Sequence, residues 1–235
     1  MFSEEINNSK FEQIWILIPC FNESRVITQT ITELSKYFEN ILVVDDGSTD
    51  NTSNLLKSLN VTVLQHPINL GQGAAVSSGF EFISTIDNSK AVITFDADGQ
   101  HSVNDALAFA NEIISSSEEI IFGSRFIHHE KNIPFTKRLV LKMVTKISNF
   151  ILKMNLSDTH NGLKAFKIDV LDKIKLKTSN YAFESELLAI VSKLGISYRE
   201  LPSDIIYTEY SKTKGQSLRN GMRILESLVI LFFNR

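Results

Sequence analysis

An apolar run that stops abruptly at two aspartates sets the strongest limit on how this chain folds. Residues Ala91–Phe95 are followed at once by Asp96 and Asp98. An apolar run of this length predicts a buried strand, and packing gives no reason for two carboxylates at its end. In an open α/β sheet, ligands bind at the carboxyl ends of the strands. We therefore expect the rest of the chain to be arranged around a ligand site at this position.

The two aspartates stand one residue apart, so they can share a hard divalent cation. Mg²⁺ takes about six oxygen ligands, typically one or two from protein carboxylates and the remainder from water and substrate phosphates. Asp96 and Asp98 therefore predict a site for a metal-bound phosphate compound. The alternative is a solvated, Asp-rich turn that holds no ligand.

Apolar runs alternate with amphipathic segments along the first half of the chain. The predicted strands are Trp15–Cys20, Ile41–Val44, Val61–Leu64, Ala91–Phe95 and Glu119–Phe122. The predicted helices are Ser24–Phe38, a segment from Thr49 or Asp50 to Leu59, a segment that follows the loop Asn69–Gly73 and ends at Ile86, and Ser102–Ser115. This alternation predicts a mostly parallel sheet with helices on both faces. The 235 residues contain no repeat, low-complexity segment or Pro/Gly-rich linker, so we expect one domain.

Two further predicted strands also end in polar pairs. Asn22 and Glu23 follow the first strand, and Asp45 and Asp46 follow the second. Asp and Asn are common in turns, so one such pair means little. Three pairs at the same edge of a parallel sheet, beside a glycine-containing loop, favour a nucleotide pocket.

The loop Asn69–Gly73 raises the alternative of a dinucleotide-binding site. Gly71 and Gly73 form a G-x-G before a predicted helix, but Val76 stands where the Rossmann fingerprint has its third glycine. The loop also follows the third strand rather than the first. We therefore interpret it as a turn that approaches the nucleotide closely, with a plain helix N-terminus as the alternative.

Five motifs in a fixed order resemble those of the family two glycosyltransferases. They are Pro19–Glu23, Val44–Ser48, Asn69–Gly73, Asp96–Gln100 and Gly123–Arg125. The branch they resemble is that of the dolichol-phosphate mannosyltransferase-like enzymes and their bacterial relatives, and the resemblance spans residues 14–220. It implies a GT-A (Rossmann-like) fold, a nucleotide-sugar donor, Mg²⁺ or Mn²⁺, and inversion at the anomeric carbon.

The resemblance gives roles to individual positions in residues 12–125, the nucleotide-sugar-binding half of the single domain 1–235. The positions it places at the nucleotide sugar are Pro19, Glu23, Asp45, Asp46, Gly71, Gly73, Asp96 and Ala97. The positions it places at the metal are Asp96, Asp98 and Gln100.

Residues 126–235 form the acceptor-side half in the same pattern. Arg125 faces the acceptor, and Asp158–Phe166 resembles the acceptor-side loop. Lys212 and Ser217 stand in a segment that resembles the family's last loop, which closes over the diphosphate of the donor. This chain departs from the family at Lys212, where an arginine is usual.

The chemistry of the acceptor decides what else the site needs. A sugar hydroxyl needs a general base, for which Asp158, Glu184 and Glu186 are the candidates, each with a solvated or capping carboxylate as the alternative. A lipid phosphate is already ionised and needs cations to hold it. We predict Asp98, Arg125 and Asp158 as the catalytic residues.

Charge is distributed unevenly between the two halves. Residues 1–118 carry 16 acidic and 5 basic side chains, whereas residues 119–235 carry 11 and 19. Such asymmetry points to partners: the acidic half would hold a metal, and the basic half would face something anionic.

The segment Lys131–Leu156 contains six basic residues and no acid. Four of them form one stripe beside an apolar face on a helical projection: Arg138, Lys142, Lys146 and Lys153. A basic amphipathic helix can lie on an anionic membrane surface. The alternative is a helix packed on its own domain with a solvated basic face. Leu218–Phe233 is a second amphipathic candidate near the carboxyl terminus.

These observations predict a metal-dependent, inverting glycosyltransferase that moves a sugar from a nucleotide sugar to a polyprenyl phosphate. The alternatives are transfer to a hydroxyl of a growing polysaccharide or glycolipid, a non-catalytic binding protein, and a sugar nucleotidyltransferase. The last would need a glycine-rich, basic loop after the first strand, which Pro19–Arg25 is not.

The same composition sets expectations for partners and location. Nucleic-acid binding is not expected, because the basic residues are not interleaved with aromatic ones. The start of the sequence is polar and acidic, and no run of about 20 apolar residues is present. We expect a cytoplasmic protein in peripheral contact with the inner face of the membrane, with Cys20 as a buried thiol.

Overall fold

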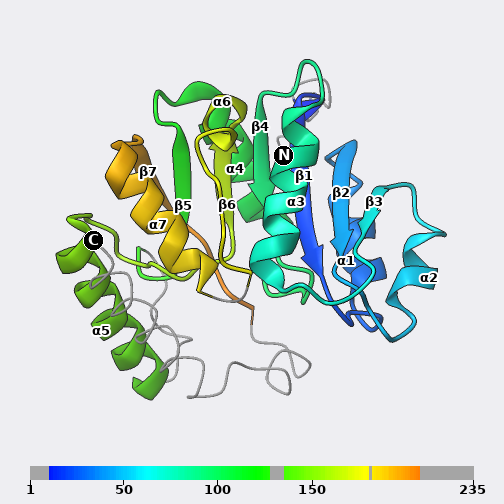
Figure 1. Ribbon diagram of the computed structural model, residues 1–235, viewed down its shortest axis with the longest axis horizontal. Helices are drawn as coiled ribbons and strands as arrows, with labels where there is room; N and C mark the ends of the chain where they lie inside the picture. The colour runs from blue at the N-terminus through cyan, green and yellow to red at the C-terminus, as the bar shows by residue number, and fades with distance from the viewer. Residues whose placement is uncertain (1–10, 128–134, 180–181, 207–235) are drawn as a thin grey trace, which may run out of the picture.

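Seven strands form one sheet at the centre of the structure, a computed structural model that describes residues 11–127, 135–179 and 182–206 (Figure 1). Across the sheet the strands are β3 (Thr62–Gln65), β2 (Asn40–Asp45), β1 (Ile14–Cys20), β4 (Ala91–Thr94), β6 (Lys164–Lys167), β5 (Ile120–Ser124) and β7 (Tyr198–Pro202). The first five strands along the chain coincide with the five predicted runs to within two residues at each end.

The directions of the strands place three loops at one edge. β3, β2, β1 and β4 pair in parallel, and so do β5 and β7. Cys20 in β1 lies beside Asp45 in β2, and Leu17 in β1 lies beside Thr94 in β4. The carboxyl ends of β1, β2 and β4 therefore meet at the lower edge of the sheet in Figure 1.

β6 was not among the predicted strands, and it runs antiparallel to both of its neighbours, β4 and β5. Its direction follows from the helix before it. The chain leaves β5 at the carboxyl edge and forms α5 (Phe135–Leu152), which packs against α7 (Phe183–Leu194) rather than across a face of the sheet (Figure 1). Because α5 does not return the chain to the opposite edge, β6 starts where β5 ended. The prediction of a mostly parallel sheet is confirmed.

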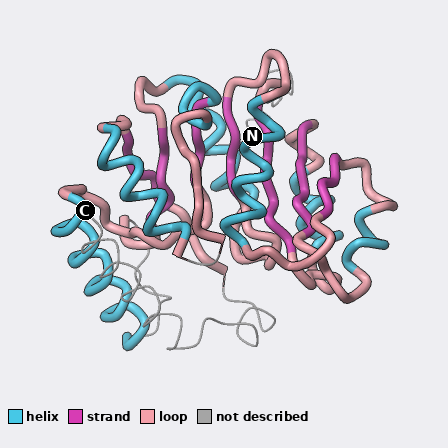
Figure 2. The backbone as a smooth tube through the Cα atoms, in the orientation of Figure 1, coloured by secondary structure: helices cyan, strands magenta, loops and turns pink. Residues whose placement is uncertain are grey.

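Helices cover both faces of the sheet, as the sequence predicted (Figure 2). In front of the sheet in Figures 1 and 2 lie α3 (Gln72–Ser84), α6 (Ile168–Leu171) and α7. Behind it lie α1 (Ile27–Leu34) and α4 (Val103–Ser115), with α2 (Thr52–Leu56) packed on α1. Each face has its own cluster of buried apolar side chains.

β1 contributes to both clusters. Ile16 and Ile18 belong to the cluster of α1 and α4, whereas Trp15 and Leu17 belong to that of α3 and α7, because successive side chains of a strand alternate. All four are buried, which explains why the strand is apolar throughout rather than alternating. Burial of each such side chain stabilises the fold by roughly 1.5–3 kcal/mol.

The helix limits differ from the predicted ones where side chains or turns intervene. α1 is shorter than the predicted Ser24–Phe38, because the carbonyl oxygen of Glu23 accepts hydrogen bonds from Val26 and Ile27 in a preceding turn. α4 begins directly after Ser102, whose Oγ accepts a hydrogen bond from the backbone N–H three residues on. The predicted helix Leu218–Phe233 lies outside the described residues.

Candidate functional site

Three loops meet at the carboxyl edge, one after each of β1, β2 and β4. They bring together Asn22 and Glu23, Asp45 and Asp46, and Asp96 and Asp98, as the parallel sheet predicted. Asn22 ties the first loop to the second. It adopts φ 55°, and its carboxamide oxygen accepts hydrogen bonds from the N–H groups of Thr49 (2.8 Å) and Asp50 (3.2 Å). Asn tolerates this left-handed conformation better than most residues.

Asp46 holds the glycine loop in place. Its carboxylate accepts hydrogen bonds from the N–H groups of Leu70 (2.9 Å) and Gly71 (2.7 Å), and it contacts Nδ1 of His66 at 2.7 Å. Nε2 of His66 lies 3.0 Å from Oγ of Ser78 in α3. Since Asp46 and His66 are both buried, this aspartate positions the backbone before α3 rather than facing solvent.

The other predicted nucleotide residues of this edge are held by their neighbours. Asp45 is fully buried, and its carboxylate accepts hydrogen bonds from the N–H of Ser48 (3.1 Å) and from Oγ of Ser53 (2.5 Å). The backbone N–H of Glu23 donates to Oγ1 of Thr52 at 2.9 Å. These contacts give the edge a fixed shape.

The two glycines of the loop are required for different reasons. Gly71 adopts φ 100°, a backbone conformation that side chains disfavour. At Gly73 a Cβ would lie 2.2 Å from the carbonyl oxygen of Thr178 and 2.7 Å from Cβ of Phe183. The close approach at Gly73 is therefore explained by the segment that leads into α7, a partner that the sequence did not indicate.

Asp96 and Asp98 follow β4 on one turn. Asp96 accepts a hydrogen bond from Nε2 of Gln72 (3.3 Å) and contacts Nε2 of His101 (3.0 Å). Asp98 accepts a hydrogen bond from the N–H of Gln100 at 3.1 Å. The intervening Ala97 is buried, and its carbonyl oxygen accepts a hydrogen bond from Oγ1 of a threonine in α1 at 3.3 Å.

Asp96 also packs against the predicted acceptor-side loop. A Cβ at Gly162 would lie 2.0 Å from Oδ2 of Asp96, so no side chain fits there. The carbonyl oxygen of Gly162 accepts a hydrogen bond from Oγ1 of Thr94 at 2.8 Å. The loop Asp158–Phe166 is thereby fixed against the end of β4, and the two predicted halves of the site touch at Asp96.

Burial and neighbouring charges act differently on the two aspartates. Burial opposes ionisation of Asp96, but its contact with His101 and the charges of Lys164 and Arg125 outweigh this and lower its pKa. For Asp98, burial and the negative charge of Asp96 raise the pKa to about 6. Two carboxylates that repel each other in this way are stabilised by a shared cation.

The pair fits the metal chemistry that the sequence predicted. Two carboxylates leave the other ligand positions of Mg²⁺ or Mn²⁺ to water and phosphate oxygens. In the described part of the chain, no group of three or more His, Cys, Asp or Glu side chains is arranged to hold a metal. A cation at Asp96 and Asp98 would therefore depend on its substrate for further ligands.

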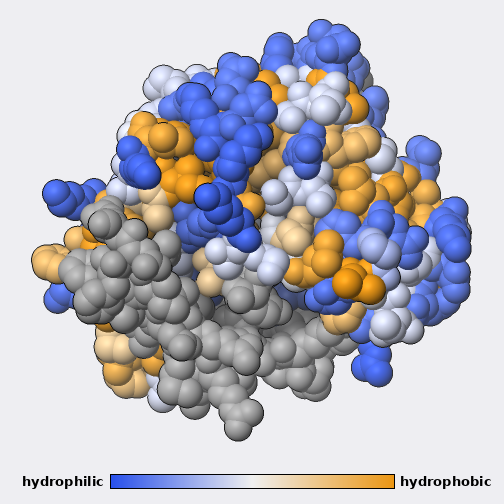
Figure 3. All heavy atoms as spheres, viewed as in Figure 1, coloured by the Kyte–Doolittle hydropathy of each residue, from blue (hydrophilic) through white to orange (hydrophobic). Residues whose placement is uncertain are grey.

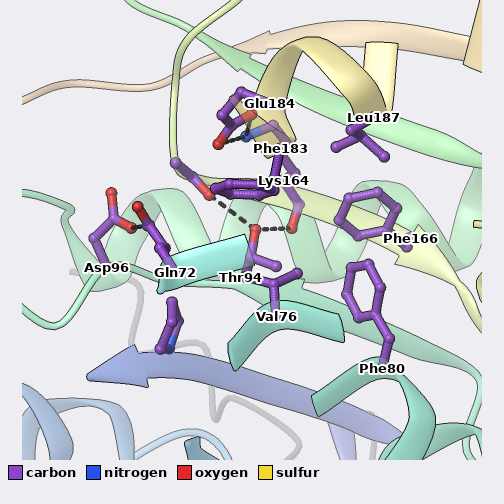
Figure 4. Close-up of a pocket in the computed structure, with 12 residues that line it drawn as sticks. Gln72, Val76, Phe80, Thr94, Asp96, Lys164, Phe166, Phe183, Glu184 and Leu187 are labelled. Atoms are coloured by element: carbon purple, nitrogen blue, oxygen red, sulfur yellow. Dashed lines mark hydrogen bonds and ion pairs between the residues drawn. The ribbon is translucent and has the colours of Figure 1, made fainter. Parts of the chain in front are cut away.

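A pocket opens beside Asp96, between α3, β4, β6 and α7 (Figure 4). Its apolar side is formed by Val76, Phe80, Phe166, Phe183 and Leu187. Its polar side is formed by Gln72, Thr94, Asp96, Lys164 and Glu184, and Pro19 and Gly162 complete the lining. The predicted nucleotide residue Pro19 and the predicted base Glu184 thus line the same pocket.

Lys164 and Glu184 form an ion pair inside this pocket. Nζ of Lys164 lies 2.8 Å and 2.7 Å from the two carboxylate oxygens of Glu184, and it donates to the carbonyl oxygen of Asn161 at 2.5 Å. Both side chains are buried. Burial raises the pKa of Glu184, and the charge of Lys164 offsets this only in part.

Arg125 forms a second ion pair, with Asp158, where β5 ends. Nε and Nη2 of Arg125 bind the two carboxylate oxygens of Asp158 at 2.5 and 2.7 Å, and Nη2 also donates to the carbonyl oxygen of His160 at 2.7 Å. This bidentate geometry is the strongest that a guanidinium makes with a carboxylate. Burial opposes ionisation of Asp158, but Arg125 outweighs it and lowers the pKa of that carboxyl.

Some predicted site residues are not brought to the pocket. Lys212 and Ser217 lie outside the described residues. Glu186 accepts hydrogen bonds from the N–H groups of Lys177 and Thr178, at 2.8 to 3.1 Å, and is not among the residues that line the pocket. Gln100 is half-buried beside Asp98.

Four residues that the sequence did not single out hold the site together. They are Gln72, His101, Lys164 and Glu200. Lys164 stands directly before the apolar Ala165 and Phe166 in β6, and that position could have marked it, whereas Glu200 stands beside Arg199 in β7 and carries no such signal. Gln72 carries no comparable signal, because its partner Asp96 comes from a separate element, whereas His101 stands only five residues after Asp96 in the loop between β4 and α4.

α5 lies within the predicted basic segment, and the structure divides its apolar residues between two faces. Val144 and Leu152 are buried. Exposed on the opposite face are Phe135 (69%), Leu139 (61%), Met143 (48%) and Phe150 (84%). These four residues, spaced by four, four and seven, share one side of the helix, and we call them the outer face of α5. Apolar side chains are visible in this region at the lower left of Figure 3.

Basic residues flank the outer face of α5. Lys142 and Lys146 are exposed, and Arg138 is half-exposed with its guanidinium 5.7 Å from the ring centre of Phe135. Lys153 lies just after the helix, with φ 54°. Among the described residues, no helix is long and apolar enough to cross a membrane.

Comparison with known protein families identifies most of this site region. The family model described as Glycosyl transferase family 2 matches residues 15–175. This stretch contains β1 from Trp15 onward, β2 to β6, the carboxylate pair, Arg125 and Asp158.

Individual relatives match over nearly their whole length. The UDP-N-acetylglucosamine–dolichyl-phosphate N-acetylglucosaminyltransferase of Methanococcus voltae is 32% identical, over 93% of this chain and 95% of the relative. The polyprenol monophosphomannose synthase of Mycolicibacterium smegmatis is 28% identical, over 88% of this chain and 83% of the relative.

Solved structures share the fold. Glucosyl-3-phosphoglycerate synthase from Mycobacterium tuberculosis, in complex with Mn²⁺, uridine diphosphate and phosphoglyceric acid, superposes with a TM-score of 0.70 at 15% identity. That match covers 96% of this chain and 80% of the other. Mannosyl-3-phosphoglycerate synthase from Rubrobacter xylanophilus gives a TM-score of 0.72 at 17% identity, over 98% and 75%.

Proposed function

The chain belongs to glycosyl transferase family 2, and we propose that it moves a sugar from a nucleoside diphosphate sugar to a polyprenyl phosphate at a membrane surface, with inversion. One observation carries this proposal. The carboxylate pair Asp96/Asp98 and the ion pair Arg125–Asp158 lie at one edge of the sheet, because the loop that begins at Asp158 packs its Gly162 directly against Asp96. Relatives named for dolichyl-phosphate and polyprenol substrates support the choice of acceptor.

Residues 12–125 would bind the donor. Asp96 and Asp98 would hold Mg²⁺ or Mn²⁺, which stabilises the charge that develops on the leaving diphosphate. Pro19, Glu23 and Asp45 would surround the base and ribose, as the family resemblance implies. Gln72 and His101 keep the Asp96 carboxylate oriented, so little reorganisation is needed when the donor binds.

Residues 126–235 would bind the acceptor, and the pairing of their carboxylates favours a phosphate. A general base must reach the proton that it removes. Asp158 is bound to Arg125, Glu184 is bound to Lys164, and Glu186 accepts bonds from backbone N–H groups. An acceptor that is already ionised needs none of these as a base.

In the reaction, an oxygen of the acceptor phosphate attacks the anomeric carbon from the face opposite the diphosphate. The new bond joins phosphate oxygen to carbon, and the bond between that carbon and the diphosphate oxygen breaks. Arg125, held in a fixed orientation by Asp158, would bind the phosphate. The contribution of the protein is mainly to hold the two reactants in this geometry.

The outer face of α5 would lie on the lipid. Its apolar residues and the flanking Arg138, Lys142 and Lys146 form a basic amphipathic surface, and the helix contains no acid. Other residues of α5 pack against α7. Membrane contact would therefore account for the outer face, and packing on the domain accounts for the opposite side. We place the protein at the inner face of the cytoplasmic membrane, where nucleotide sugars are available.

The decisive test is a transfer assay. Purified protein, Mn²⁺ and a panel of radiolabelled uridine and guanosine diphosphate sugars are incubated with a polyprenyl phosphate in detergent, and the label in the organic phase is counted. We expect transfer to the phosphate, none to the unphosphorylated polyprenol, and none with chelator. Asp98→Asn should be inactive. Asp87→Asn, an exposed carboxylate in the loop before β4, should match the wild type. Transfer to a glycan hydroxyl but not to the phosphate would refute the proposal.

A further inference from the structure

The carboxylate of Glu200 is turned onto the backbone of a neighbouring loop. Glu200 lies in β7, beside Phe122 of β5 in the parallel register of these strands. Its two oxygens accept hydrogen bonds from the N–H of Ser157 at 2.9 and 2.8 Å, and one of them also accepts from the N–H of Asp158 at 3.1 Å and from Oγ of Ser157 at 3.0 Å. Side chain and loop are 43 residues apart in sequence, so the contact depends on the tertiary fold.

The loop that Glu200 holds also carries the partner of Arg125. Asp158 binds Arg125 through both carboxylate oxygens, and it accepts hydrogen bonds from the N–H groups of Arg125 and His160 at 3.2 Å each. A second link joins Oγ of Ser157 to Oγ of Ser124 at 2.5 Å. Glu200, the loop and the end of β5 therefore form one connected hydrogen-bond network.

A carboxylate suits this position better than an amide. The loop presents two N–H donors and a hydroxyl to Glu200, and an ionised carboxylate can accept from all of them. A glutamine would replace the oxygen that lies 2.8 Å from the Ser157 nitrogen by an NH₂ group, so two N–H donors would face each other and the side chain could not keep this position. Glu200 and Asp158 also carry like charges in close proximity, and burial together with that repulsion raises the pKa of Glu200. Two like charges held close together destabilise the folded protein, so we expect the position of Glu200 to serve the site.

We propose that Glu200 is a positioning residue that fixes the orientation of Arg125 for the acceptor phosphate by holding the Ser157–Asp158 backbone. This inference rests on the proposed function for the identity of the acceptor, and on the hydrogen-bond network for the rest. Loss of Glu200 should weaken acceptor binding and leave donor binding unchanged, because Asp96 and Asp98 are held by other residues.

The first test needs no substrate. The Nε–H signal of Arg125 is assigned by nuclear magnetic resonance from its absence in Arg125→Lys, and its exchange with solvent is measured. Loss of one charge-assisted hydrogen bond predicts exchange that is about tenfold faster in Glu200→Gln. Ser157→Ala, which cuts the side-chain link and keeps the backbone ones, should give a smaller increase. If Glu200→Gln does not fold, Ser157→Ala still tests whether the network holds Arg125.

Glu119 provides a matched control. It lies directly before β5, at the opposite end of the β5–β7 pair from the Ser157–Asp158 loop. Its carboxylate accepts a hydrogen bond there from the N–H of Ser197, directly before β7, at 3.1 Å. Glu119→Gln should change neither the exchange rate of Arg125 nor the transfer reaction. If it speeds the exchange as much as Glu200→Gln does, the effect is general loosening of the sheet, and the inference is wrong.

The second test is a double-mutant cycle in the transfer assay. Glu200→Gln should raise KM for the polyprenyl phosphate about tenfold, with KM for the donor unchanged. In an Arg125→Gln background the same substitution should change KM less than twofold, because the residue through which it acts is gone. Equal effects in both backgrounds would overturn the inference. A wild type that transfers nothing to the phosphate would refute the proposed function, while the exchange measurement would still judge the role of Glu200.

Discussion

Two of the three pairs of ionisable side chains described at the site combine opposite charges. Arg125 pairs with Asp158, and Lys164 pairs with Glu184, each between opposite charges and away from solvent. Asp96 and Asp98 instead place two carboxylates on one turn, and burial together with the negative charge of Asp96 raises the pKa of Asp98. At the residue scale, this imbalance is the reason to expect a cation at the carboxylate pair rather than elsewhere in the described structure.

The position of Asp96 depends on a glycine opposite it. Gly162→Ala should displace the Asp96 carboxylate, because the new Cβ would lie 2.0 Å from its Oδ2. We expect Mn²⁺-dependent binding of uridine or guanosine diphosphate, measured by calorimetry, to weaken about tenfold to a hundredfold, the usual cost of a disturbed metal ligand.

A second glycine separates this effect from general destabilisation. Gly195→Ala strains the backbone at φ 63° after α7, where no atom lies close to the added Cβ. It should lower the melting temperature and leave binding intact. If the Gly162→Ala variant binds the nucleoside diphosphate with wild-type affinity, the Asp96 carboxylate can move without weakening ligand binding, and the prediction is wrong.

His160 makes the stability of the protein depend on pH. Burial lowers its pKa to about 4, although Asp158 opposes the shift and Arg125 and Lys164 add to it. The unfolded chain, with a His pKa near 6.5, therefore binds this proton more readily, and the free energy of unfolding falls as the pH drops. Between pH 7 and pH 5 the loss from this group is about 2 kcal/mol.

Urea unfolding of the wild type and of His160→Asn at both pH values measures this contribution. The loss of stability on acidification should be smaller in the variant by that amount. Other titrating groups, including Asp98, are present in both proteins and cancel in the difference. An identical loss in both would mean that His160 is not a neutral, buried group in the folded state.

At the scale of elements, α5 has two sides of different character. One side packs against α7, where the carbonyl oxygen of Leu152 accepts a hydrogen bond from Oγ of Ser192 at 2.5 Å, and the outer face presents four apolar residues beside a stripe of basic ones. A helix that served only as packing would expose polar residues there. The exposed stripe, with 84% of Phe150 accessible, is the observation that points to a lipid surface.

Replacing Arg138, Lys142 and Lys146 together by Gln should weaken binding to anionic vesicles about a hundredfold. Each basic residue near an anionic surface contributes roughly 1 kcal/mol, and added salt should weaken wild-type binding in the same way. Co-sedimentation with vesicles that contain phosphatidylserine measures the effect. Lys36, Lys57 and Lys90, all exposed and outside α5, make a matched triple Gln control with the same change in charge. Equal losses in both triple variants would argue against a specific contact through α5.

At the scale of the whole molecule, one strand joins the acidic and basic parts of the chain. β6 lies between β4 and β5, and its register places Lys164 beside Thr94 and Phe122. The acceptor-side loop that precedes β6 is thereby delivered to the same edge as the carboxylate pair. The uneven charge of the sequence thus becomes a site in which acidic and basic side chains meet at one edge of the sheet.

Ligand binding at this shared edge should stabilise the whole fold. A ligand at about 100 times its Kd adds about 2.7 kcal/mol to the free energy of unfolding. For a chain of this size that corresponds to a rise in Tm of about 5–10 °C. We expect it with Mn²⁺ and uridine or guanosine diphosphate together, a small rise with either alone, and none in Asp98→Asn. A full rise with the nucleotide in the presence of chelator would place the diphosphate away from the carboxylate pair.

The sequence by itself determined the alternation of strands and helices, the mostly parallel sheet and the clustering of acids at one edge. Each of these rests on local information: an apolar run, a periodicity, or the residues just after a strand. Cys20 and Phe95 close their runs in the sequence, and Asp45 directly follows its run. In the structure Cys20 and Asp45 close β1 and β2, and Phe95 directly follows β4, because strand ends depend on neighbours a few residues away.

Only the tertiary structure decided which charges pair, because each pair joins segments that the sequence keeps apart. Glu184 and Asp158 are candidate bases in the sequence, and only the fold pairs Glu184 in α7 with Lys164 and Asp158 with Arg125 at the end of β5. Glu200 had no assigned role before β7 was paired with β5. The direction of β6 and the exposed side of α5 were likewise set by packing. Burial makes an unpaired charge costly, so the fold selects partners that no local pattern can reveal.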